Sequence, residues 1–290
     1  MSTTTVTSSV RTPRAARSAT VAGRAAFNAL LLRDLTVLKK NLGVFIARTL
    51  IQPFLLVFVF LYVFPQIGEG VGGSSTGGLS SFATILVAGV VGLSIMFQGI
   101  QAVALPLANE FGYTKEIEDR VLAPLPVSLV AIGKVVAGAI QGLIAAAIVF
   151  PIAAVVHAKD VHPNLAVHWL LLLTLIPLTS IMTSSLGLVL GTRIAPRNIG
   201  IMFGFIVLPI TFLGGTYYPW TMLAAIKVGG FPWLQALVCV NPLIYVTEGF
   251  RAALTTAPHM PLYVIYPVLA AFCVFFLWVG CRGFHGRVIG

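Results

Sequence analysis

The chain has 290 residues, of which 58% are hydrophobic and only 9% are charged. A soluble domain carries about 25% charged residues, so this composition excludes most soluble folds and indicates an integral membrane protein. The net charge of +10 is scattered among long apolar runs, which favours membrane topology over nucleic-acid binding as its cause.

The N-terminal region precedes any long apolar run. Residues 1–21 are rich in Ser, Thr, Arg and Ala without apolar periodicity, which predicts a disordered basic cytoplasmic tail attracted to anionic lipid. The segment 24–41 has helical periodicity, with an apolar face formed by Phe27, Leu31, Leu35 and Leu38. We expect an amphipathic helix lying along the membrane interface. The alternative is an N-terminal extension of the first membrane span.

Six apolar runs are long enough to cross a bilayer, which requires about 20 residues. They are 43–65, 82–105, 127–156, 166–191, 198–218 and 261–281. Placing the loops on alternate sides puts 13 Lys and Arg residues on one side and 3 on the other. Because positive residues favour the cytoplasm, both termini are predicted to be cytoplasmic. Arg48 and Lys134 lie near the ends of two runs, where we expect their side chains to extend to the headgroups.

Catalytic and metal-binding patterns are absent from the sequence. There is no GxxxxGK[ST] phosphate loop, no HExxH and no GxSxG, and Cys239, Cys273 and Cys281 form no metal-ligand spacing. We therefore expect no catalytic residue, no metal and no cofactor in this chain. No Asp or Glu lies in the middle of a predicted span, which argues against a proton-coupled carrier.

One cytoplasmic connection is unusually charged. The stretch 110–120 holds six of the chain's 26 charged residues, and prolines at 124 and 126 follow it. Its pattern predicts a short mixed-charge helix with a small apolar side, suited to docking on a soluble partner. An ordinary solvated loop is the alternative. The candidate contact residues are Glu110, Gly112, Glu116, Ile117, Glu118, Asp119 and Arg120.

The stretch 219–250 is too apolar for an exposed loop, yet prolines and glycines interrupt it too often for a continuous membrane helix. A re-entrant hairpin that dips into the outer leaflet, before the last helix, satisfies both facts. Glu248 and Arg251 are three residues apart and are expected to pair on one helix. The residues that mark this outer hairpin are Pro219, Trp220, Pro232, Trp233, Asn241, Pro242, Glu248 and Arg251.

In this order, these features resemble the membrane subunit of an ABC-2 type ABC exporter, of the drug-resistance and nodulation-factor permease group. The resemblance rests on Glu110 and Gly112, the Pro-containing turn with Gly133-Lys134, and the outer motifs Gly214-Gly215, Tyr218-Pro219, Pro232-Trp233, Asn241-Pro242 and Arg251. It covers roughly residues 22–285. We accordingly expect one all-α transmembrane domain over 22–288, with six spans, an interfacial helix and the re-entrant hairpin.

The resemblance also implies partners and a mechanism. Two such subunits, identical or paralogous, would pair with two cytosolic ATPase subunits that bind ATP and Mg, in the cell membrane of a prokaryote. Segment 110–122 would be the coupling helix, and the hairpin would form the outer gate. The substrate path would be lined by the first, second and fifth spans. Its candidate apolar residues are Phe54, Phe58, Phe97 and Phe205.

The leading hypothesis is therefore a permease that exports hydrophobic small molecules, drugs or lipids. Within the same architecture, the alternative substrate is a lipid-linked polysaccharide or glycolipid. A stand-alone membrane enzyme or channel is the alternative from another class, although such an enzyme should show convergent His, Asp or Glu side chains near one interface.

Overall fold

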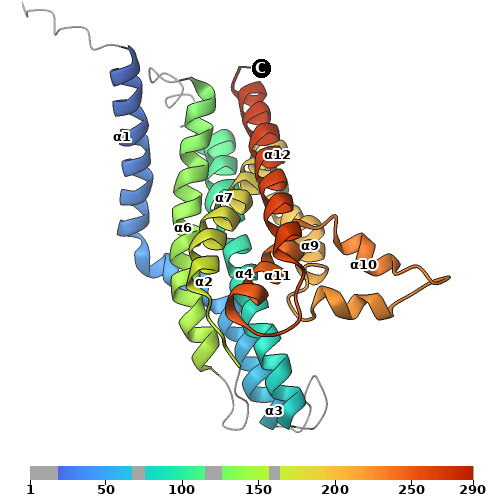
Figure 1. Cartoon of the computed structure of the whole chain (residues 1–290). Coiled ribbons are helices and arrows are strands. Elements are labelled where there is room, and N and C mark those ends of the chain that lie inside the picture. The colour runs from blue at the N-terminus through green and yellow to red at the C-terminus, as the bar shows by residue number, and fades with distance from the viewer. Residues whose placement is uncertain (1–18, 67–75, 115–125, 157–163, 290) are drawn as a thin grey trace, which may run out of the picture.

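The computed structural model describes residues 19–66, 76–114, 126–156 and 164–289 (Figure 1). This part of the chain is helical throughout, apart from its connections, and contains no strand beyond isolated bridges of Leu165 with Thr255 and Val228 with Phe231. The expected all-helical membrane fold is confirmed.

Five helical segments are long and apolar enough to cross a membrane. They are α2 (Leu42–Phe58) with the π-helix η1 (Val59–Val63), α4 (Thr76–Asn109), α6 (Val127–Val155), α7 (Trp169–Arg193) and α12 (Leu262–Ile289). Short segments extend two of them: α3 (Phe64–Gln66) follows η1, and the π-helix η2 (Glu110–Thr114) follows α4. Each of the five crossing-length segments overlaps one of the predicted apolar runs.

The predicted span 198–218 contains a helical run over 199–212 only, which changes from α-helix to π-helix and back. After a 3-10 turn, η3 (Pro196–Asn198), come pieces of 4, 5 and 5 residues: α8 (Ile199–Met202), the π-helix η4 (Phe203–Val207) and α9 (Leu208–Phe212). The chain leaves helical geometry at Gly214 and Gly215, where Gly215 has a φ of 67°. These pieces reach only about 20 Å, against roughly 30 Å of hydrocarbon. Only five of the six predicted spans are therefore of crossing length in the described residues.

The N-terminal helix α1 (Ala19–Lys40) is separate from α2, because a turn at Asn41 lies between them. The predicted apolar face of Phe27, Leu31, Leu35 and Leu38 is half-buried, whereas Arg33, Thr36 and Lys40 are exposed. The expected position of this helix along the membrane interface stays a prediction. Figure 1 shows α1 beside the first half of α6, where the Phe27 ring approaches Gly133. The N-terminal end of α1 and the C-terminal end of α12 lie at the same end of the bundle (Figure 1).

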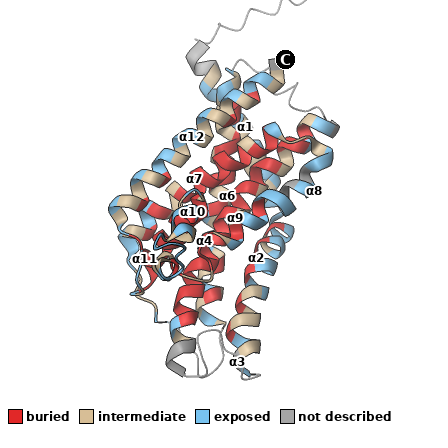
Figure 2. Cartoon of the chain, turned by 90° about the vertical axis from the view of Figure 1, so that its right-hand side faces the viewer, coloured by how far each residue is buried: buried red, intermediate tan, exposed pale blue. Residues whose placement is uncertain are grey.

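Helix α4 forms the centre of the bundle and packs against α6, α7 and α11 (Pro242–Leu254). Of its most apolar stretch 83% is buried, against 11% for α12, so α12 lies at the periphery. Small residues permit the close approach of α4 to α7, because a Cβ at Gly187 would lie 2.8 Å from the carbonyl oxygen of Ile100. Figure 2 shows the buried residues concentrated along these central helices, with exposed residues on α2 and α8.

The stretch 219–250, predicted to form a re-entrant hairpin, divides into two helical parts. The 3-10 helix η5 (Trp220–Ala225) and α10 (Trp233–Val238) form an arm that projects sideways from the bundle (Figure 1). Helix α11, in contrast, is buried in the bundle along its whole length. The prediction counted Pro242 as a break, but proline at the first position of a helix starts it.

Candidate functional site

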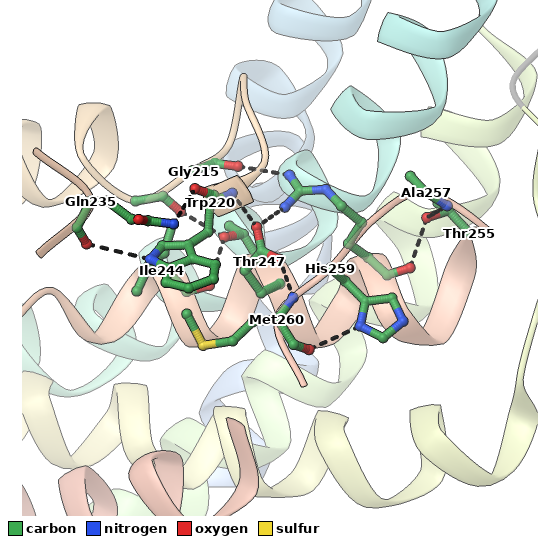
Figure 3. A network of polar contacts seen from close by, with 12 residues as sticks. Gly215, Trp220, Gln235, Ile244, Thr247, Thr255, Ala257, His259 and Met260 are labelled. Carbon is green, nitrogen blue, oxygen red and sulfur yellow. Dashed lines mark hydrogen bonds and ion pairs between the residues drawn. The ribbon is translucent and has the colours of Figure 1, made fainter. Parts of the chain in front are cut away.

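Glu248 and Arg251 lie on α11, and both side chains are fully buried. The expected ion pair between them is present, with the Arg251 guanidinium donating to Glu248 Oε1. Oε1 also accepts a hydrogen bond from the backbone N–H of Trp220 at 2.7 Å, and Oε2 accepts one from the N–H of Met260 at 2.7 Å. We call these residues, together with Gly215, the Glu248–Arg251 network (Figure 3).

The network connects three separate segments of the chain. Arg251 donates from its second terminal nitrogen to the carbonyl oxygen of Gly215 at 2.9 Å. One buried ion pair thus holds the turn after α9, the start of the arm and the segment that precedes α12. Beside it, the hydroxyl of Thr247 donates to the carbonyl oxygen of Gly214 at 2.6 Å. These contacts give the turn a fixed position against the core.

Burial determines the electrostatics of this pair. Desolvation lowers the pKa of the Arg251 guanidinium from its ordinary value, while the charge and hydrogen bond of Glu248 act in the opposite direction. Arginine remains protonated in proteins despite such shifts. A buried charge is tolerated only when it is paired and its remaining donors or acceptors are used, and Glu248 meets that condition with three donors.

Asn241 and Pro242 position α11. Asn241 caps the helix, since its Oδ1 accepts a hydrogen bond from the N–H of Leu243 at 3.0 Å. Its Nδ2 donates to the carbonyl oxygen of Ile210 in α9 at 2.7 Å. The Asn-Pro pair therefore starts the buried helix and attaches it to the short helical pieces before the arm.

The arm is fastened at its base and tightly turned at its tip. Trp220 Nε1 donates to the carbonyl oxygen of Gln235 at 3.3 Å, and Gln235 Nε2 donates to that of Trp220 at 3.4 Å. At the tip, Gly229 and Gly230 have positive φ angles of 60° and 83°, which glycine adopts without strain. Pro219 and Pro232 precede the two helical limbs. Several large apolar side chains of the arm are exposed, Trp233 among them.

A second buried charged cluster lies where α1, α4 and α6 meet. Lys134 Nζ is 2.6 Å from Glu110 Oε1 and 3.5 Å from Asp34 Oδ2, and the Lys134 side chain is only 6% exposed. This corrects the expectation that Lys134 extends to the headgroups. The reason is local: two carboxylates inside the bundle compensate its charge.

The predicted coupling segment is only partly described. Glu110 is buried against Lys134, so its carboxylate is not presented to a partner. Gly112 packs against Pro196, because a Cβ at this position would meet the proline ring. The other candidate contact residues, Glu116, Ile117, Glu118, Asp119 and Arg120, lie outside the described residues.

The four candidate aromatic residues of the substrate path do not form one cluster. Phe54 and Phe58 stack along α2, with ring centroids 5.7 Å apart, and Tyr62 continues the row at 5.2 Å. Phe205 in η4 is 80% exposed. Phe97 is half-buried in α4 against the core and lines a small pocket beside Thr49 and Gln98.

Sequence reasoning missed the long-range partners in both clusters. Met260 and Gly215 contribute only backbone atoms, which carry no sequence signal. Asp34 was not singled out, although its position on the partly buried face of α1 was a signal, because a carboxylate on such a face needs a cation nearby.

Comparison with known proteins gives a consistent result. The family model described as "ABC-2 type transporter" matches residues 25–255. The chain is 26% identical over 234 residues to the inner membrane transport permease YadH of Escherichia coli strain K12, covering 79% of this chain and 84% of the relative. The YadH proteins of Escherichia coli O157:H7 and Shigella flexneri match with the same identity and coverage.

Proposed function

Because the chain belongs to the ABC-2 type transporter family, and is thus the membrane subunit of an ABC transporter, we propose that it exports hydrophobic small molecules, drugs or lipids. The family match over most of the helical bundle carries this proposal. Membership makes the chain a transport permease and not an enzyme, and it implies an ABC ATPase as partner.

The energy for transport comes from that partner. In the proposed assembly two ATPase subunits, which bind ATP and Mg, act on two permease subunits that are identical or paralogous. The permease needs no phosphate loop of its own, and its sequence has none. Both chain termini face the cytoplasm in this assembly, in agreement with the common end of the bundle at which α1 begins and α12 ends, and with the distribution of Lys and Arg.

Coupling begins at the cytoplasmic end of α4. Residues 110–122 dock on the ATPase, and the buried ion pairs of Lys134 with Glu110 and Asp34 connect this segment to α6 and α1. A movement of the docked segment is therefore transmitted to three helices together. The ATPase drives the change only if it binds the two membrane conformations with different affinity.

The arm and the Glu248–Arg251 network form the outer gate in this proposal. The network fixes the base of the arm to buried α11, while the exposed apolar side chains of the arm are free to contact lipid or the second permease. The aromatic row of α2 and the exposed Phe205 then face the path between the two permeases.

The test is reconstitution with the partner ATPase in lipid nanodiscs. We expect the complex to hydrolyse ATP and a subset of hydrophobic compounds or lipids to raise the rate at least twofold, whereas the purified permease alone should hydrolyse none. A complex in which the ATPase carries a substituted phosphate-loop lysine is the control. Failure of every ATPase of the same organism to co-purify with this chain would contradict the proposal. Stimulation by glycolipids alone would select the polysaccharide alternative.

A further inference from the structure

A polar groove of about 560 Å³ lies between α1, α2, α4 and α6, apart from the arm and its network. Charged residues of four helices line it, among them Arg33, Asp34, Arg48, Glu110 and Lys134. A smaller pocket adjoins it and shares Arg48 and Gln101. These positions fall within or beside candidate membrane spans, where ionisable side chains are costly and mark a function by default.

The charges of the groove do not balance. Three cations face two carboxylates, and both carboxylates lie within 3.5 Å of Lys134. Arg33 also has a partner. Arg48 makes no ion pair and no hydrogen bond with any described residue. The groove therefore carries one uncompensated positive charge, and it is located on Arg48.

The neutral residues around Arg48 include glutamines and a threonine, whose amide and hydroxyl groups can donate hydrogen bonds. Thr49 Oγ1 donates to Gln98 Oε1 at 3.0 Å, and Gln98 Nε2 donates to Gln141 Oε1 at 3.3 Å. This chain of bonds uses the acceptor of Gln141 and leaves its amide N–H groups without a partner among the described residues. Gln52 lines the smaller pocket and Gln101 lines both, and no described residue accepts a bond from their amides either.

We propose that this groove binds the anionic head of an amphiphile, with Arg48 as the central contact. A guanidinium binds a phosphate or carboxylate through two parallel hydrogen bonds, and the glutamine amides supply further donors. The side chains of Val44, Ile51 and Leu55 are exposed on α2 near Arg48. The acyl chain of the ligand lies along this apolar surface, which a free inorganic anion would leave unused.

Extension of Arg48 to the membrane surface would explain a lone arginine at this depth. It would not explain why three glutamines without hydrogen-bond partners for their amides line the same space. Within a membrane such amides are themselves costly unless a ligand or water satisfies them. The uncompensated cation favours an anion, and the amides beside it supply donors to its oxygens.

The experiment is calorimetric titration of the purified full-length chain, in uncharged maltoside micelles, with dihexanoyl phosphatidic acid. We expect one site per chain, and at least tenfold weaker binding in Arg48→Gln, because the variant loses the charge-assisted hydrogen bonds to the anion. Arg48→Lys should retain part of the affinity, since it keeps the charge but loses the paired geometry. Arg282→Gln, which removes an exposed arginine of α12 outside the groove, should bind like the unaltered chain.

Two further titrants distinguish the sources of the anion. Dihexanoyl phosphatidylcholine has the same chains but no net charge, and inorganic phosphate has the charge but no chains; both should bind at least tenfold more weakly. Equal binding of either one, or undiminished binding in Arg48→Gln, would overturn the proposal. No ATPase is present in this measurement, so its result is independent of the proposed export.

Discussion

At the scale of single residues, the carboxylate of Glu248 holds the buried network together. Its carboxylate accepts from Arg251 and from two backbone N–H groups of distant segments, inside a fully buried site. Replacing only one partner of a buried ion pair leaves an uncompensated charge and lowers the stability of the fold by about 3–5 kcal/mol. Replacing both partners by apolar groups often leaves the stability unchanged.

Substitution of Glu248 tests this account of the network. We expect Glu248→Leu to lower the free energy of unfolding by about 3–5 kcal/mol, measured by thermal unfolding of the purified chain in detergent. The double variant Glu248→Leu with Arg251→Met should recover part of the loss, because no buried charge remains. Lys227→Gln, an exposed charge at the arm's tip, is the control and should leave the melting temperature unchanged. Equal stability of Glu248→Leu and the control would refute the role of the pair.

At the scale of elements, close helix packing depends on particular glycines. Glycines recur at four-residue spacing in the sequence, at 138 and 142, 187 and 191, and 200 and 204, but they differ in what surrounds them. Gly138 and Gly187 lie against neighbouring helices, since a Cβ there would approach other atoms within 3 Å, whereas Gly200 and Gly204 have nothing within 4 Å in this chain. Spacing alone carries no information about which face of a helix meets a neighbour.

Alanine substitution distinguishes these two kinds of glycine. Gly187→Ala would place a methyl group 2.8 Å from the Ile100 carbonyl oxygen. Because this oxygen belongs to the backbone, it cannot move aside as the end of a flexible side chain can. We expect a loss of about 1–3 kcal/mol, measured as a lower melting temperature. Gly286→Ala, with open space around it in α12, should be neutral or slightly stabilising. Similar melting temperatures for both variants would contradict the packing of α4 against α7.

The long helices were predictable because hydrocarbon imposes a simple rule, about 20 apolar residues per span. The Glu248–Arg251 pair was predictable because a spacing of three places two side chains on the same face. The short pieces over 199–212 and the burial of α11 were not. Hydropathy counts apolar residues without recording where glycine or a π-turn interrupts the helix, and the partners of Lys134 are 24 and 100 positions away in sequence.

At the scale of the whole molecule, the arrangement of charge suits a subunit that a separate ATPase subunit drives. The described ion pairs form two clusters: that of Glu248 holds a turn, the arm and a connecting segment against α11, and that of Lys134, near the proposed ATPase side, joins several helices. Because Glu110 is already paired within the bundle, we expect the other acidic residues of the coupling segment to contact the ATPase. Those residues are Glu116, Glu118 and Asp119.

Reversing that charge should uncouple the transporter without disturbing the bundle. In the complex with its ATPase, Glu116→Lys with Asp119→Lys should lower substrate-stimulated ATP hydrolysis about tenfold, which corresponds to a coupling free energy of about 1.4 kcal/mol. The amount of permease in the membrane should remain unchanged, because added lysines in a connection predicted to be cytoplasmic agree with the positive-inside rule. Arg282→Gln, which removes the charge of an exposed side chain of α12, should leave stimulation intact. Full stimulation in the double variant would place the ATPase contact elsewhere, and loss of membrane insertion would show that the segment serves folding.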